Sequence, residues 1–111
     1  MMNNEETEKK KRFNLEERLI DFSVLITEIV EAMPNTRAGN HYAGQLIRSG
    51  TSPALNYGEA QSGESRKDFI HKLKIAEKEA NETEYWLLLC KHSKNYPFDE
   101  AEVEISLEVA A

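Results

Sequence analysis

The sequence predicts an all-α protein, a single domain of 111 residues built as a bundle of four helices. Two long segments carry apolar residues at alternating spacings of three and four, which is the repeat of an amphipathic helix. A third segment lies between them, and its small residues fall into stripes of the same period. Because each such helix has an apolar stripe to bury, we expect these helices to pack against one another.

The first predicted helix follows a polar segment. Residues 1–12 are charged and lack an apolar run, so we predict a flexible polar tail ahead of a bundle domain at residues 13–111. The helix is predicted to begin after Asn14, where Glu17 completes a capping pattern, and to end before Pro34. Its apolar stripe consists of Leu15, Leu19, Phe22, Ile26, Ile29 and Met33.

The second predicted helix spans Thr36 to Ala60, although this segment is rich in helix-breaking residues. Small side chains let neighbouring backbones approach closely, and each glycine costs about 1 kcal/mol relative to alanine. Pro53 removes a hydrogen bond and clashes with the carbonyl of Ser49, so we expect a kinked helix. A turn at residues 61–65, with Gly63 in the left-handed conformation, is expected to reverse the chain.

The third predicted helix begins after Ser65, an N-cap with Asp68 as its partner, and extends to His92. A fourth, short helix is predicted to begin at about residue 97. Residues 102–109 alternate between polar and apolar, which alone favours a strand, but a lone strand would have no partner among helices. The stripe of the third helix consists of Phe69, Leu73, Ala76, Ala80, Thr83, Leu87 and Cys90.

The stretch SGTSPALNYGEAQSGESRKDFIHKLKIAEKEANETEYWLLLC resembles the motif of the bacterial 23S rRNA intervening-sequence proteins. The resemblance implies an antiparallel up-down-up-down four-helix bundle, often a homopentamer. It also implies a mostly uncharacterised function: the genes lie in 23S rRNA insertions, and one relative is a nucleic-acid-binding accessory protein of diversity-generating retroelements. The matching positions are Ser49 to Ser52, Asn56, Glu59, Ala60, Glu64, Ser65, Asp68, Phe69, Lys72 to Ala76, Glu79, Glu82, Thr83, Trp86 and Leu87.

The charge distribution limits where an anionic partner could bind. The formal net charge is −6, which argues against a surface that attracts nucleic acid everywhere. Residues 37–78, however, contain 7 basic and 4 acidic residues, a local charge of +3. The functional hypothesis is a non-enzymatic assembly protein that binds RNA, or an RNA-handling protein, through basic residues of the second and third helices. The candidate phosphate contacts are Arg48, Arg66, Lys67, Lys74 and Lys78.

The alternative hypothesis is a structural or protein-interaction module without a nucleic-acid role. On this interpretation the basic residues form a solvated helix face, and nearby Asp68, Glu77 and Glu84 supply ion pairs within the helix. The salt dependence of RNA binding distinguishes the two hypotheses.

The sequence contains no recognisable catalytic, metal-binding or cofactor-binding constellation, and we predict that the protein is not an enzyme. Asp68 and His71 have the spacing of the acid and histidine in one half of a carboxylate-bridged di-metal site. Such sites need this motif twice and two further acids, and the sequence has no second copy. Cys90 and His92, two residues apart, point to different faces of a helix, so Cys90 is predicted to be a packed thiol. No small-molecule substrate is evident.

Asn56 lies on a stripe of small residues three positions after Pro53. We predict that its amide satisfies backbone groups freed by the proline, and a ligand contact is the alternative. Tyr85 and Trp86 are predicted to pack in the core and at the edge of the bundle rather than to form a platform for stacked bases.

Location and oligomeric state follow from two simple observations. A single cysteine allows no intramolecular disulfide, and no apolar run suggests a membrane segment, so a cytoplasmic protein is expected. A short fourth helix would leave side chains such as Ile26, Phe69 and Leu73 half exposed, so we expect a homo-oligomer. The alternative is a truncated chain whose fourth helix is normally longer.

Overall fold

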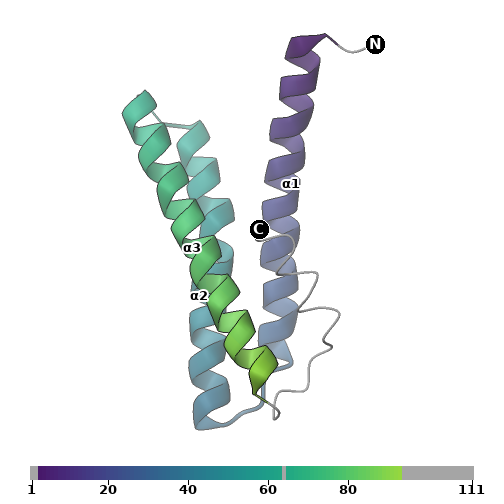
Figure 1. The fold of residues 1–111 in the computed structure, drawn as a ribbon, viewed down its shortest axis with the longest axis vertical. Coiled ribbons are helices and arrows are strands. Elements are labelled where there is room, and N and C mark those ends of the chain that lie inside the picture. Colours follow the sequence, from purple (N-terminus) through teal and green to yellow (C-terminus); the bar gives the residue numbers. More distant parts are fainter. Residues whose placement is uncertain (1–2, 64, 94–111) are drawn as a thin grey trace.

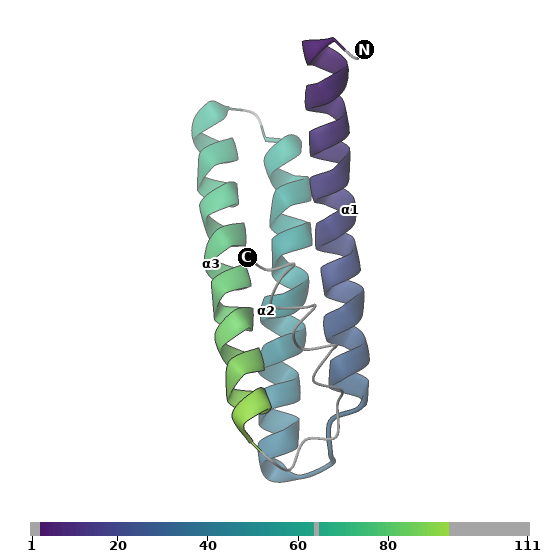
Figure 2. The same ribbon diagram turned by 45° about the vertical axis from the view of Figure 1, so that its right-hand side comes forward.

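The computed structural model describes residues 3–63 and 65–93, and this part of the chain is three long α-helices without strands. They are α1 (Asn4–Glu31), α2 (Arg37–Gln61) and α3 (Arg66–His92). The helices run alternately down, up and down, and α2 packs against both α1 and α3 (Figures 1 and 2). The all-α prediction is confirmed. The predicted fourth helix and its strand alternative lie outside the described residues, so the four-helix bundle stays a prediction.

Helix α1 begins at Asn4, well before the predicted N-cap. The capping prediction at Asn14 is therefore wrong, and residues 4–12, predicted as part of a flexible tail, are helical. Glutamate and lysine, which are frequent in this segment, are good helix formers. The helix ends at Glu31, where the predicted boundary before a proline is confirmed.

Helix α2 confirms that the segment rich in small residues is helical. The hydroxyl of Thr36 caps it by accepting a hydrogen bond from the Gly39 N–H at 3.0 Å. The helix continues through Pro53, whose ring is buried, and Figure 2 shows no break in the ribbon. The kink at this residue stays a prediction.

The turn after α2 differs from the prediction in its backbone conformation. Gly63 is not left-handed, because no described glycine has a positive φ. Instead the Ser62 N–H bonds to the carbonyls of Gly58 and Glu59, and the Gly63 N–H bonds to the Ala60 carbonyl at 3.2 Å. These bonds tighten the last turn and satisfy the terminal carbonyls without a left-handed residue.

Helix α3 begins as predicted. The Ser65 hydroxyl accepts a hydrogen bond from the Asp68 N–H at 3.1 Å, and the helix extends to His92. Its C-cap is Ser93, whose N–H bonds to the carbonyls of Leu89 and Cys90. The predicted bounds of this helix are therefore confirmed.

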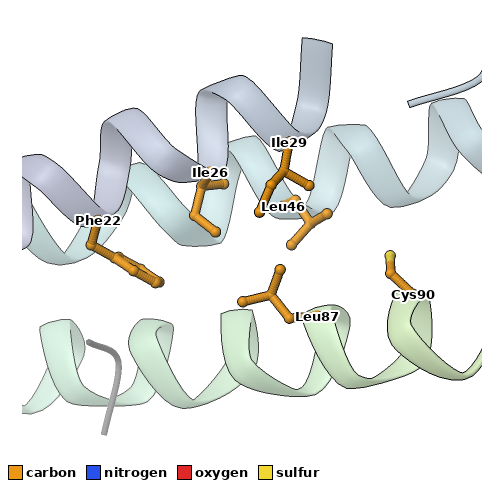
Figure 3. Packing of buried hydrophobic residues seen from close by; sticks show 6 residues of the cluster. All are labelled: Phe22, Ile26, Ile29, Leu46, Leu87 and Cys90. Carbon is orange, nitrogen blue, oxygen red and sulfur yellow. The ribbon is translucent and has the colours of Figure 1, made fainter. Parts of the chain in front are cut away.

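The hydrophobic core joins the C-terminal halves of α1 and α3 to the middle of α2. It consists of the fully buried side chains shown in Figure 3, which are Phe22, Ile26, Ile29, Leu46, Leu87 and Cys90. The expectation that Ile26 is half exposed is wrong, since its side chain is 0% exposed. Leu15 and Phe69, near the other end of the molecule, are 40% and 38% exposed.

Glycine and serine bring α1 and α2 into close contact. A Cβ added at Gly50 would lie 2.6 Å from Cγ2 of Ile26, so only glycine fits there without a shift. The Ser23 hydroxyl lies within hydrogen-bonding distance of the Gly50 carbonyl at 3.2 Å and of the Leu19 carbonyl at 3.0 Å. The small residues of α2 therefore serve close helix packing, as their sequence pattern suggests.

Candidate nucleic-acid interface

One face of α3 is exposed along its whole length and carries no carboxylate. Its residues recur at spacings of three and four, so they lie on one side of the helix, opposite the buried Thr83, Leu87 and Cys90. We call this surface the outer face of α3. It consists of Lys67, His71, Lys74, Lys78, Asn81, Tyr85, Leu89 and His92, all of them exposed.

Three of the five predicted phosphate contacts lie on the outer face of α3. Lys67, Lys74 and Lys78 form no ion pair with any residue that the structure describes. The intrahelical pairs with Asp68, Glu77 or Glu84 that the alternative hypothesis invokes are therefore absent from the described part. The acidic residues flank this face instead of interrupting it.

Arg66 is the first residue of α3 and lies away from the three lysines. It borders an open cavity of about 910 Å³ near the turn between α2 and α3, together with Leu15, Tyr57 and Phe69. Successive residues of a helix point about 100° apart, so Arg66 and Lys67 face different directions. The structure therefore does not bring Arg66 into the same cluster as the lysines.

Arg48 is held by two carboxylates of α3. Its Nη1 lies 3.0 Å from Oε2 of Glu79, and its Nη2 bonds to Glu82 and, at 3.1 Å, to Oε1 of Gln45. The hydrogen bond that Arg48 donates to Glu82 raises the pKa of its guanidinium most; burial opposes this effect, and the hydrogen bond donated to Glu79 adds to it. Because its charge is already matched, Arg48 joins α2 to α3 rather than offering a free charge to a phosphate.

A second ion pair links the same two helices nearer the turn. Lys72 Nζ lies 2.6 Å from Oε2 of Glu59. Both partners are more than a third exposed, so this pair contributes little to stability. It does remove Lys72 from the set of unpaired basic groups on α3.

Asn56 makes its hydrogen bonds within α2. Its Nδ2 donates to the carbonyl of Ser52 at 3.0 Å and to the Ser52 hydroxyl at 2.8 Å. The carbonyl that Pro53 deprives of its donor belongs to Ser49, so these bonds go to a different residue from the predicted one. The amide is partly buried and satisfies groups in the turn that contains Pro53.

The adjacent aromatic residues Tyr85 and Trp86 of α3 face different directions, about 100° apart around the helix. Trp86 packs against the core and lies 5.8 Å, between ring centroids, from Tyr42 and 5.7 Å from His41. Tyr85 is 71% exposed, so the prediction that it packs in the bundle is wrong for this residue. The signal that identifies it is its spacing, because Tyr85 follows Lys78 by seven residues, two turns on the same face.

Cys90 is a packed thiol, as predicted. Its side chain is 1% exposed, and burial raises its pKa to about 11. The thiol is therefore protonated near neutral pH, and the nucleophilic thiolate is scarce. His92 lies on the outer face of α3, away from the buried sulfur.

Within residues 3–63 and 65–93, no three or more histidine, cysteine or acidic side chains gather in a way that could hold a metal ion. In the same ranges, no helix combines the length and the apolarity that crossing a bilayer requires.

Comparison with known proteins places the chain in a family. Residues 11–107 match the profile of the 23S rRNA-intervening sequence proteins. The chain belongs to this family. A crystal structure of a protein of unknown function from the S23 ribosomal protein family of Bacteroides thetaiotaomicron VPI-5482 is 35% identical, with a TM-score of 0.78. The similarity covers 86% of this chain and 87% of that one. The curated proteins contain no match.

In this intervening-sequence protein, the residues that carry the family resemblance serve the packing of the helices. Ser49 is buried, and its hydroxyl bonds to the Gln45 carbonyl, while Gly50 contacts α1. Further along, Glu79 and Glu82 hold Arg48. The motif therefore accounts for how α1, α2 and α3 fit together, and the outer face of α3 lies mostly outside it.

Proposed function

We propose that this intervening-sequence protein is a non-enzymatic helical assembly protein that binds RNA through the outer face of α3. The observation that carries the proposal is the position of three lysines on an exposed face without a carboxylate, none of them in an ion pair with a residue of the described ranges 3–63 and 65–93. Such a face is a local site for phosphates even though the net charge of the whole chain is −6. The name of the family, which refers to ribosomal RNA, supports the same class of partner.

Phosphate contacts make binding salt-dependent and insensitive to base sequence. Three contacts to a single strand predict a slope of about −2 for the logarithm of affinity against the logarithm of salt concentration. Affinity should then fall roughly 20-fold between about 50 and 200 mM salt. Arg48 and Lys72 are not expected to contribute, because carboxylates already pair them.

Reversing two charges on the outer face is expected to weaken RNA binding. The Lys74→Glu, Lys78→Glu double variant should lose about tenfold or more in affinity, and the salt slope should become shallower by about 1.4. Fluorescence polarisation with a labelled single-stranded RNA measures both quantities.

The matched control changes the net charge equally at another place. Arg18 and Arg37 are exposed on α1 and α2, so the Arg18→Glu, Arg37→Glu variant should bind within about twofold of the wild type, since distant charges are screened. Equal losses in both double variants would show a response to net charge alone and would contradict a site on α3.

A second surface supports the assembly part of the proposal. Ile20 and Val24 of α1 and Leu55 of α2 are 49%, 51% and 66% exposed, on the side of these helices away from the core. They border a shallow cavity of about 250 Å³. Clustered apolar side chains on a small protein are typical of interaction surfaces. A protein-interaction role without RNA would rest on this surface alone.

Self-association is the expected outcome at micromolar concentration. Light scattering should give a multiple of the 12.7 kDa chain mass, because association covers apolar area worth roughly 25 cal/mol per Å². Leu55→Lys should shift the mass toward the monomer, whereas Leu89→Lys, on the outer face of α3, should not. A wild-type mass of 12.7 kDa would contradict assembly through this surface.

A further inference from the structure

Tyr85 extends the outer face of α3 beyond the lysines. Its ring is 71% exposed, while the neighbouring Trp86 makes the aromatic contacts with α2. Tyr85 lies two helical turns after Lys78, about 10.5 Å along the axis. The ring of Tyr85 therefore lies on the same face of α3 as the three lysines. Its separation from Lys78 is one that a short stretch of nucleic-acid chain can span.

From this alignment we infer that the outer face of α3 takes unpaired RNA, with a base stacked on the ring of Tyr85 and the adjoining phosphates on Lys74 and Lys78. The inference rests on the proposed function and adds the class of RNA. Aromatic side chains interleaved with basic ones are the means by which proteins hold single strands, since every base has a π-face.

Two neighbours of Tyr85 fit a stacked base. Asn81 and Leu89 lie four residues before and after it, so their Cβ atoms are about 5–6 Å from that of Tyr85 on the same face. Leu89 is 51% exposed and offers an apolar contact, and the Asn81 amide offers a donor and an acceptor to a base edge. These groups match an unstacked base rather than a phosphate backbone.

A duplex does not fit this surface equally well. Its bases are already stacked on each other, so an exposed tyrosine finds no π-face along the helix. The major groove of double-stranded RNA is too deep and narrow for side chains to read, and duplex recognition uses contacts spread over about 16 base pairs. The three lysines would still attract the duplex, which predicts weaker binding without a contribution from Tyr85.

The test compares a labelled 12-nucleotide single-stranded RNA with a blunt duplex of the same length by fluorescence polarisation at about 50 mM salt. Tyr85→Ala is expected to weaken single-strand binding at least about fivefold and duplex binding less than about twofold. Tyr85→Phe should keep wild-type affinity, because the ring remains. Ile70→Ala, an exposed apolar residue of α3 beside the outer face, is the control for loss of apolar area.

The outcomes separate the two proposals. Unchanged binding of both RNAs by Tyr85→Ala, with weakened binding by Lys74→Glu, Lys78→Glu, would overturn base stacking and leave RNA binding intact. An equal loss on both probes would also overturn it. If the wild-type protein binds neither probe, the inference and the proposed function fall together. Thermal unfolding of each variant is followed by circular dichroism. A melting temperature equal to that of the wild type shows that the substitution changes the surface and leaves the fold intact.

Discussion

Replacing Gly50 by alanine is expected to lower the free energy of unfolding by about 1–3 kcal/mol, although alanine is the better helix former. The new Cβ would lie 2.6 Å from Cγ2 and 2.9 Å from Cβ of Ile26. Ile26 is fully buried and cannot swing aside, so α1 and α2 would have to separate. Denaturant unfolding followed by circular dichroism measures the change.

The control is the same substitution at glycines of the same helix with free space. A Cβ at Gly44 or Gly58 meets no atom within 4 Å. Gly44→Ala and Gly58→Ala should therefore raise the free energy of unfolding by up to about 1 kcal/mol, through backbone entropy. If Gly50→Ala were also stabilising, the close contact between α1 and α2 would be incorrect.

Local sequence signals were sufficient for α2 and α3. The cap at Ser65 depends only on residues within one turn, and the structure shows its bond to the Asp68 N–H. The start of α1 was missed because two local signals compete. A capping pattern at Asn14 favours a boundary, whereas the charged residues before it favour continuing the helix, and the structure follows the latter.

The candidate site could be predicted only in part, because spacing along one helix does not fix how two helices face each other. Lys74 and Lys78 were placed correctly on an exposed face, since that needs only the period of α3. The ion pairs of Arg48 could not be predicted, because its partners, Glu79 and Glu82, come from another helix. The rotation of α2 against α3 decides that contact.

Truncating Leu87 to alanine is expected to cost about 2–5 kcal/mol, the largest effect among the leucines of α3. Its side chain is 0% exposed and points from α3 toward Ile29 of α1 and Leu46 of α2 (Figure 3). Removing it leaves a cavity that three helices would have to close. A protein of this size commonly has only 5–15 kcal/mol of stability, so a lower melting temperature should be evident.

The control is Leu89→Ala, which removes the same atoms from the same helix two residues away. Both variants change helix propensity equally, so a difference between their losses of stability reports burial. Leu89 is 51% exposed on the outer face of α3, so its truncation should cost no more than about 1 kcal/mol. Comparing Leu87→Ala with Leu89→Ala therefore tests which face of α3 points inward. The exposed positions of Lys74, Lys78 and Tyr85 depend on the same orientation. Equal losses in the two variants would mean that α3 is rotated from its described orientation, and an outer face defined by these residues could not then exist.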